Sequence, residues 1–480
     1  MLTYDLGKKE GPLYISLYNA VREDIMRGIL KGGSKLPSKR EMAGNNAVSV
    51  ITVENAYSLL LCEGYIYSRP RSGYFVSDIT KSQIHNRDEV PLRPEKESEP
   101  AEKRAILADF SKSQTPPSLF PFDGWLKAVK KVFGDERENL LLASPSEGIA
   151  ELRRSIALYL REYRGLSVDE ECIVVGAGSE YLYGVLINLL GRDNIYALED
   201  PGYSKTGRIY LSEGVKVEYI PLDREGIRKD ELEKRRIDIV HITPSHQYPT
   251  GIVMPVSRRY EILSWASSGD GRYIIEDDYD SELRLDSRPI PSFKSIDTEG
   301  RVIYLNTFSK TLSPTVRISY MVLPPSLMKK YRSELSFYSS TVSTFEQYTL
   351  HVFMSQGRME SHINRLRTYY RRKRDALLAA IRRSSLGEIV EIRNEKAGLH
   401  FLMHVNSAKC EEDIMRDAER LSVSLLPLSS FYHNPASAEK NTFIMNYGAL
   451  EGDKIDSVVE RLRIAFTEGD LTGGKSPLKL

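Results

Sequence analysis

A charged, proline-containing stretch divides the chain, and it constrains the possible folds more than any other feature. Between Asp78 and Ala108 large apolar residues are scarce, while prolines and charged residues dominate the run 91–100. Such a segment buries too little apolar surface to offset its ordering entropy, so we expect a flexible tether. The 480 residues also exceed what one hydrophobic core usually holds. We therefore expect a multidomain protein with a small domain over 1–77, a linker over 78–108 and a large domain over 109–470.

Charge and cysteine content exclude several classes of protein. The net charge of +1 draws no nucleic acid by itself, so any DNA affinity needs a local basic patch. Three widely spaced cysteines (Cys62, Cys172 and Cys410) and eight histidines show neither a disulfide framework nor metal-ligand spacing. No apolar run reaches bilayer length, and the start lacks a signal-peptide pattern. We expect a cytoplasmic protein with no metal centre and no membrane contact.

The first segment has the periodicity of a small helical domain. Apolar residues recur every four positions from Leu13, which predicts an amphipathic helix ended by the glycines 32–33. Ser38, with Glu41 three residues later, is a capping-box pattern that starts a second helix. A third helix is expected over 49–60.

A hairpin should follow the three helices. Strands are expected over 64–67 and 74–76, around a turn at 69–73 that contains proline and glycine. This is the α+β arrangement of a winged helix-turn-helix, although the pattern alone also permits a small helical domain with a solvated hairpin. The residues suited to DNA are Ser38, Lys39 and Arg40 opening the second helix, Ser49, Thr52 and Asn55 on the third, and Arg69, Arg71 and Gly73 on the turn.

Five short blocks in this segment resemble the winged helix of the GntR family. They are Pro12–Tyr14, Leu36–Ser38, Thr52–Tyr57, Glu63–Tyr65 and Ser72–Val76. The resemblance implies binding to double-stranded DNA. One position departs from the family, because Val50 stands where an arginine often opens the recognition helix, so base preference should differ.

The large segment alternates short apolar runs with helical stretches, which favours an α/β domain with a largely parallel sheet. Three of the predicted strands end in chemically useful residues. A glycine-rich turn follows the first at 173–180, carboxylates and a phenol follow the second at 273–279, and hydroxyls and a lysine follow the third at 302–310. Each alone also has a plain structural reading, such as a packing turn or a solvated strand end.

Taken together, these strand ends match the needs of pyridoxal phosphate. That cofactor requires a lysine for its Schiff base, an anion at the pyridinium nitrogen, a donor at the ring oxygen and a phosphate cup. We assign the first three roles to Lys310, Asp277 and Tyr279. The phosphate cup is expected from Gly178, Ser179, Glu180, Thr307, Ser309 and Arg317.

The same segment resembles the fold-type-I aminotransferases from about residue 110 to the 460s. The blocks that carry the resemblance are Glu199–Tyr203, Thr243–Gly251, Glu276–Tyr279 and Ser309–Arg317. It implies a pyridoxal-phosphate-dependent α/β domain with a small C-terminal α+β subdomain, and it places Tyr203 near the cofactor ring. Joined to the winged helix, the whole chain resembles the MocR-type branch of GntR regulators. That branch implies a homodimer that holds the cofactor between subunits and moves its DNA-binding heads with ligand state.

Three departures from the aminotransferase pattern bear on function. Tyr248 replaces the usual asparagine at the ring oxygen, 143–148 lacks the Tyr and Asp often found before its glycine, and 442–448 carries no arginine for a substrate carboxylate. Without that bidentate fork an amino acid would bind weakly, so efficient transamination is not expected. The basic run 365–374 is interpreted as a solvated helix face and His246 as a residue that shapes its loop.

These features predict a transcriptional regulator that senses pyridoxal phosphate itself and controls its synthesis. Two alternatives stay open. One is a regulator that senses an amino acid or amine through an external aldimine, and the other is an active aminotransferase with an accessory head.

Overall fold

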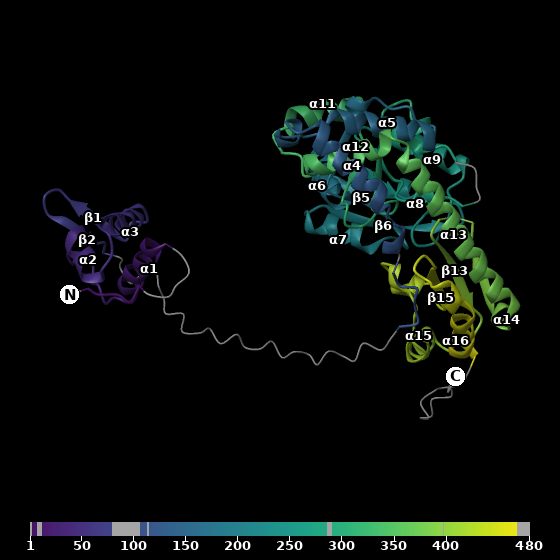
Figure 1. Cartoon of the computed structure of the whole chain (residues 1–480). Coiled ribbons are helices and arrows are strands. Elements are labelled where there is room, and N and C mark those ends of the chain that lie inside the picture. Colours follow the sequence, from purple (N-terminus) through teal and green to yellow (C-terminus); the bar gives the residue numbers. More distant parts are fainter. Residues whose placement is uncertain are drawn as a thin grey trace. The chain divides into compact units, whose positions relative to one another are not determined.

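The computed structural model describes residues 2–6, 12–78, 106–112, 115–285, 290–396 and 398–467. The chain divides into two compact units, Met1–Glu102 and Lys103–Leu480 (Figure 1). Most of the linker predicted over 78–108 lies outside the described residues. Its last residues belong to the second unit, because the backbone N–H of Leu107 donates to the carbonyl of Ser422 at 2.8 Å.

The first unit is the predicted winged helix-turn-helix. Its elements are α1 (Leu13–Met26), α2 (Lys39–Asn46), α3 (Val50–Cys62), β1 (Ile66–Arg69) and β2 (Gly73–Val76). The two strands form an antiparallel hairpin. One core joins the helices to the hairpin, and Leu17, Val53, Tyr57, Leu60 and Val76 are fully buried in it.

The predicted end of the first helix was wrong. α1 stops at Met26, because Gly28 takes a left-handed backbone conformation with φ 75°. Ile29, which continues the apolar stripe, is 62% exposed. The glycines at 32–33 serve the hairpin instead, where Gly33 N–H donates to the carbonyl of Val76 at 2.8 Å.

The second unit is built around an eight-stranded sheet in the order β4-β11-β10-β9-β8-β5-β6-β7. Neighbouring strands from β10 to β6 run parallel, whereas β11 is antiparallel to both β10 and β4, and β7 to β6. The strands are β4 (Ile173–Gly176), β5 (Ile195–Asp200), β6 (Lys216–Asp223), β7 (Gly226–Ile227), β8 (Ile239–Ile242), β9 (Tyr273–Asp277), β10 (Val302–Thr307) and β11 (Ser319–Val322).

Helices cover both faces of this sheet (Figure 1). Ile173 and Val175 pack into one core and Val174 into another, as the alternation along a strand requires. The helices are α4 (Phe122–Asp135), α5 (Ala150–Arg164), α6 (Ser179–Leu190), α7 (Ser204–Ser212), α8 (Lys229–Lys234), α9 (Val256–Ser267), α10 (Phe293–Ile296), α11 (Pro325–Glu334) and α12 (Thr344–Ser355).

A small α+β subdomain completes the second unit, as predicted. It has an antiparallel sheet β12-β13-β15 and a short parallel pair β14-β3. Its elements are α13 (Arg358–Arg383), α14 (Leu386–Ile389), β12 (Val390–Arg393), β13 (His400–Val405), α15 (Glu411–Arg420), β14 (Val423–Ser424), β15 (Thr442–Asn446) and α16 (Ile455–Thr467), with β3 (Ala108–Asp109) from the start of the unit. No helix in the described ranges is long and apolar enough to cross a membrane.

The basic run 365–374 lies on α13 and is not a fully solvated face. Arg367 Nε donates to the carbonyl of Glu282 at 2.6 Å, Arg371 to that of Leu285, and Lys373 to that of Leu450. The sequence interpretation was therefore partly wrong, because these cations bind backbone carbonyls of neighbouring loops.

Candidate functional site

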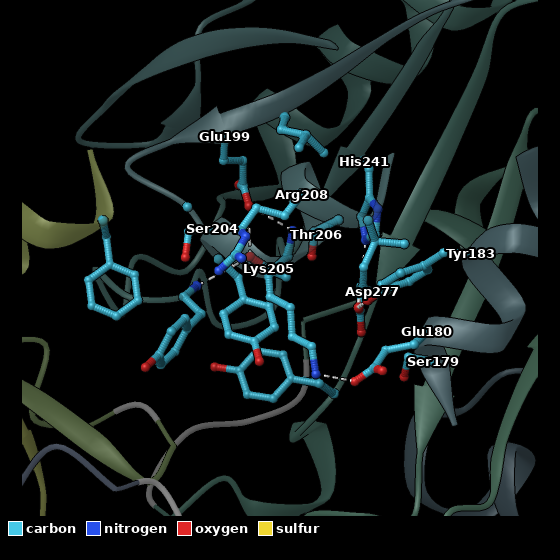
Figure 2. Close-up of a pocket in the computed structure, with 18 of the residues that line it drawn as sticks. Ser179, Glu180, Tyr183, Glu199, Ser204, Lys205, Thr206, Arg208, His241 and Asp277 are labelled. Carbon is cyan, nitrogen blue, oxygen red and sulfur yellow. Dashed lines mark hydrogen bonds and ion pairs between the residues drawn. The ribbon is translucent and has the colours of Figure 1, made fainter. Parts of the chain in front are cut away.

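A cavity of about 830 Å³ lies at the carboxyl ends of the parallel strands (Figure 2). Loops that follow parallel strands meet at one edge of a sheet, which is where α/β proteins bind ligands. All ten residues predicted to hold a cofactor line this cavity. They are Gly178, Ser179, Glu180, Tyr203, Asp277, Tyr279, Thr307, Ser309, Lys310 and Arg317. The fold thus brings together residues that are up to 139 positions apart in sequence (317 − 178).

Asp277 ends β9 and is held by two residues that sequence reasoning missed. The Tyr183 hydroxyl donates to Asp277 Oδ2 at 2.7 Å, and His241 Nε2 lies 3.6 Å from the same oxygen. Figure 2 shows the carboxylate next to both side chains. A carboxylate held in this way can accept a hydrogen bond from a group bound in the cavity.

The turn from β4 to α6 forms another part of the cavity wall. Gly178 has φ 93°, and a Cβ built there would lie 2.8 Å from a guanidinium nitrogen of Arg317. The glycine therefore lets the arginine approach the N-terminus of α6, where free N–H groups favour an anion. The hydroxyls of Thr307 and Ser309 are 2.9 Å apart on the adjoining loop.

Lys310 is half-buried and lines the same cavity. Burial lowers the pKa of its amine, and the carboxylate of Asp280 opposes the shift. A lower pKa increases the neutral fraction, which is the form that attacks a carbonyl carbon. Burial also raises the pKa of Tyr279 well above its usual value, so its hydroxyl stays protonated and can donate.

His246 is a buried structural partner of the loop after β9. Its Nδ1 lies 2.7 Å from Asp280 Oδ2 and 3.2 Å from the Tyr279 hydroxyl. The ring does not line the cavity. Its contacts agree with the interpretation that it shapes its loop.

The cavity also contains cations that the sequence did not single out. Lys112, Lys205 and Arg208 line it, and Lys205 forms an ion pair with Glu180 (Figure 2). The three residues lie just after β3 and in α7, outside the strand ends from which the sequence predicts the cofactor site. Of the three, only Lys205 could have been expected in the cavity from the sequence, because it lies two residues after Tyr203.

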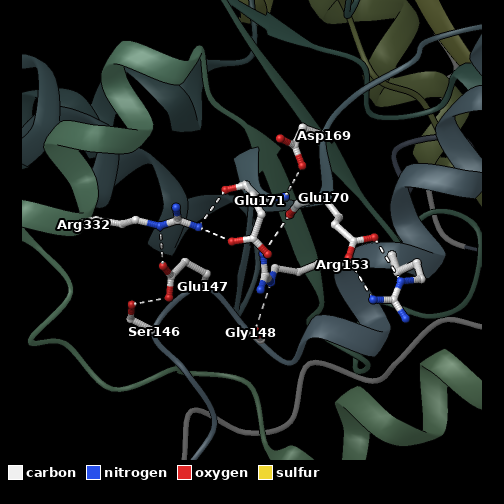
Figure 3. Close-up of polar contacts among 9 residues, drawn as sticks. Ser146, Glu147, Gly148, Arg153, Asp169, Glu170, Glu171 and Arg332 are labelled. Carbon is white, nitrogen blue, oxygen red and sulfur yellow. Dashed lines mark hydrogen bonds and ion pairs between the residues drawn. The ribbon is translucent and has the colours of Figure 1, made fainter.

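Of the three departures from the aminotransferase pattern, Tyr248 lines the cavity, whereas neither 143–148 nor 442–448 contributes a side chain to it. The loop 143–148 takes part in an ion network, in which Arg332 pairs with both Glu147 and Glu171 (Figure 3). Arg153 joins the same network through Glu171, at 3.1 Å, and the carbonyl of Gly148. β15 is wholly buried, and Asn446 Nδ2 donates to the carbonyl of Phe110 at 2.8 Å.

The first unit exposes the groups expected to meet DNA, although several also have structural partners. Ser38 closes the predicted capping box with Glu41. Ser49 caps α3, its oxygen accepting from Thr52 N–H at 3.1 Å and lying 2.8 Å from the Thr52 hydroxyl. Lys39 pairs with Glu54 at 2.6 Å.

The hairpin turn presents two arginines in different ways. Arg69 lies over its neighbours' rings, 4.9 Å from that of Phe75 and 5.4 Å from that of Tyr67. Arg71 is exposed and has φ 60°, and Gly73 follows with φ 108°. The tight turn thus holds one cation against the hairpin and leaves the other in solvent.

The two units together define a DNA-binding regulator with an aminotransferase-like body. Residues 13–76 match the family described as bacterial regulatory proteins of the gntR family, and residues 111–462 match aminotransferase class I and II. Because the second match spans most of the chain, and full-length relatives share both units, the chain belongs to the MocR-type subgroup of GntR-family transcriptional regulators.

The relatives align over nearly their whole length. The chain is 36% identical to the uncharacterized HTH-type transcriptional regulator YdeL of Bacillus subtilis, over 95% of this chain and 97% of YdeL. It is 30% identical to the probable rhizopine catabolism regulatory protein MocR of Rhizobium meliloti, over 96% and 95%. It is 27% identical to the pyridoxine biosynthesis transcriptional regulator PdxR of Corynebacterium glutamicum, over 94% and 96%.

The body also matches solved aminotransferases. The kynurenine aminotransferase of Pyrococcus horikoshii superposes with a TM-score of 0.65 at 26% identity, covering 75% of this chain and 90% of that one. Within the described ranges no group of three or more His, Cys, Asp or Glu residues is placed to hold a metal ion.

Proposed function

We propose that this regulator binds pyridoxal phosphate at Lys310 and senses the cofactor itself. The observation that carries the proposal is the set of groups around one cavity. The half-buried amine of Lys310, a carboxylate held by Tyr183 and an arginine packed on Gly178 match the three parts of the cofactor. The family of the body is pyridoxal-phosphate-dependent, which supports the same assignment.

The residues present fit this group. Bound pyridoxal phosphate would supply an aldehyde carbon and an electron-withdrawing ring. Lys310 would provide the amine that condenses with the aldehyde, and Asp277 would hold the proton on the ring nitrogen. Tyr279 would donate to the ring oxygen. Gly178, Ser179 and Arg317 would bind the phosphate through backbone N–H groups and a guanidinium.

Sensing, rather than catalysis, is favoured by the missing substrate arginine. β15 carries no arginine, and its described side chains do not reach the cavity. A substrate carboxylate would therefore lack the bidentate contact that holds it for efficient turnover. The relative PdxR, which is named for pyridoxine biosynthesis, supports the cofactor as the sensed molecule.

An anionic amine is the second candidate effector. Arg208 brings a guanidinium to the cavity wall beyond the groups assigned to the phosphate, whereas Lys112 and Lys205 pair with Asp109 and Glu180. A small amino acid could use such a cation for its carboxylate, while its nitrogen exchanges with that of Lys310. The relative named for rhizopine catabolism favours an effector of this amine class.

The regulator should act as a homodimer in the bacterial cytoplasm, where its DNA is. Large apolar side chains are exposed on α4 and in the segment after it, including Phe122 at 68%, Leu126 at 53% and Leu141 at 83%. Such a set usually marks a protein contact. Two heads per dimer would read repeated half-sites.

Absorbance and turnover test the proposal. Purified protein incubated with pyridoxal phosphate should become yellow, and borohydride, which reduces C=N bonds, should fix the cofactor to the peptide containing Lys310. Lys310→Ala should do neither, whereas Lys216→Ala, at an exposed position at the start of β6, should behave as the natural chain. Sustained conversion of amino donors with an oxo acid would contradict the proposal and would show that the body is an active aminotransferase.

A further inference from the structure

The exposed face of α3 carries an unusual combination of side chains for a helix that reads DNA. Ile51 is 68% exposed, and Val50 before it is 43% exposed. Ile51, Asn55 and Ser58 are all exposed and lie at i, i+4 and i+7, so they form one stripe along the helix. Val53, Ala56, Tyr57 and Leu60 occupy the opposite, buried face.

The polar groups near this stripe are already engaged. The hydroxyls of Ser49 and Thr52 are 2.8 Å apart, and Ser49 accepts from the Thr52 N–H. The carboxylate of Glu54 is bound by Lys39 at 2.6 Å, which offsets its repulsion of DNA phosphates. Among the described residues of α3, Ile51 and Asn55 are therefore the side chains best placed to meet base edges.

These two side chains suit A·T pairs. In the major groove thymine alone presents a methyl group, and adenine presents the N6 donor and N7 acceptor that an asparagine amide matches. Against guanine or cytosine, an aliphatic side chain would leave the polar edge of the base without a hydrogen-bond partner. Arg40 on α2 and Arg71 on the hairpin turn are exposed and can bind phosphates.

We propose that Ile51 packs on a thymine methyl and Asn55 bonds an adjacent adenine, so that each half-site requires neighbouring A·T pairs. The proposal concerns the DNA-binding head alone and holds whichever molecule the body senses. It also explains the position of Val50 as a second aliphatic residue at the start of the reading helix, where family members often carry arginine.

Deoxyuridine provides the sharpest test, because it differs from thymidine only by the missing methyl. Binding sites are first selected from randomised duplexes with the full-length chain, and each thymine of the selected half-site is then replaced by uracil. At one position the replacement by uracil should weaken binding about fourfold, which corresponds to the free energy of burying one methyl-sized group. Ile51→Ala should bind the thymine site more weakly and show no further loss with uracil.

A matched control is available in the same unit. Ile29 is also an exposed isoleucine, at 62%, but lies in the loop after α1. Ile29→Ala should keep the fourfold preference for thymine. The proposal is overturned if uracil is tolerated at every position, if Ile51→Ala keeps the natural preference, or if the selected half-sites are fixed as G·C or not fixed at all. Retained non-specific DNA affinity in that last case would leave the DNA-binding function intact.

Discussion

The Tyr183 hydroxyl donates a 2.7 Å hydrogen bond to Oδ2 of Asp277, and both side chains are buried. The bond joins the first helix after the glycine-rich turn to the end of β9. It fixes the direction of the carboxylate, because a buried phenol with a raised pKa stays a donor at neutral pH. Through this contact the orientation of the proposed ring anchor depends on α6.

Tyr183→Phe removes this bond without changing the packed ring. A net hydrogen bond to a charged group is worth about 1.5 kcal/mol or more, so affinity for pyridoxal phosphate should fall about tenfold. An absorbance titration measures the loss. Tyr196→Phe is the matched control, since its buried hydroxyl donates to the carbonyl of Gly191 outside the cavity. Equal affinities of the Tyr183 variant and the natural chain would contradict the proposal that Asp277, oriented by Tyr183, anchors the cofactor ring.

Gly178→Ala should damage the phosphate end of the cavity. The new Cβ would lie 2.8 Å from Arg317, and φ 93° is unfavourable for alanine. We expect affinity for pyridoxal phosphate to fall at least tenfold, with a smaller loss for pyridoxal. Gly165→Ala also falls at a positive φ, 62°, although in the αL region, where alanine is less strained; its Cβ would meet no atom within 4 Å and it lies outside the cavity, so it should leave both affinities unchanged. An equal loss for the two vitamers would argue against phosphate binding here.

Glu199 predicts a pH dependence of stability. Burial raises its pKa to about 7, although Thr243 and Gln247 donate to one of its oxygens. Because the folded pKa lies above the ordinary value, its contribution is fully present below pH 4.5 and is lost as pH rises through about 7. Glu199→Gln should therefore stabilise the body by up to about 3 kcal/mol at pH 8 and by little at pH 4.5.

Urea unfolding at both pH values measures this difference. Exposed Glu388 supplies the control, because Glu388→Gln should have the same small effect at each pH. A stabilisation by Glu199→Gln that is independent of pH would contradict the assignment of a buried, protonated carboxyl.

The helix cap of α2 gives a prediction for the head. Ser38→Ala removes the oxygen that accepts from Glu41 N–H at 3.2 Å, which should cost the head about 1 kcal/mol. In thermal unfolding, the transition of the head should shift downward and that of the body should not. Ser58→Ala, on the exposed face of α3, should shift neither. A downward shift of the body instead would contradict the separate folding of the two units.

Much of the fold and the cavity could be predicted from local patterns. Lys310, Asp277 and Tyr279 each follow a strongly apolar strand, and parallel strands bring their carboxyl ends to one edge. Tyr183 and His241 could not be found in this way, because they reach Asp277 through strand order and helix packing. The pairing of β8 beside β9 places His241 there, and only the tertiary structure specifies that pairing.

The sequence predictions that were wrong for the end of α1 and for the charged run on α13 failed for a similar reason. The apolar stripe of α1 continued to Ile29, but Gly28 ended the helix first, because backbone conformation overrides periodicity at a terminus. The arginines of α13 looked like a solvated face, yet Arg367 binds the carbonyl of Glu282. A run of charged residues does not show which loop carbonyls will need hydrogen-bond donors in the folded protein.

The most direct test of the account is the affinity of the full-length protein for its selected DNA, measured with and without pyridoxal phosphate and without any amine. The natural chain should change its affinity at least fivefold when the cofactor is added, and Lys310→Ala should bind the same DNA with no response. A response that persists in Lys310→Ala, or an unresponsive natural chain that has demonstrably bound the cofactor, would contradict cofactor sensing through Lys310.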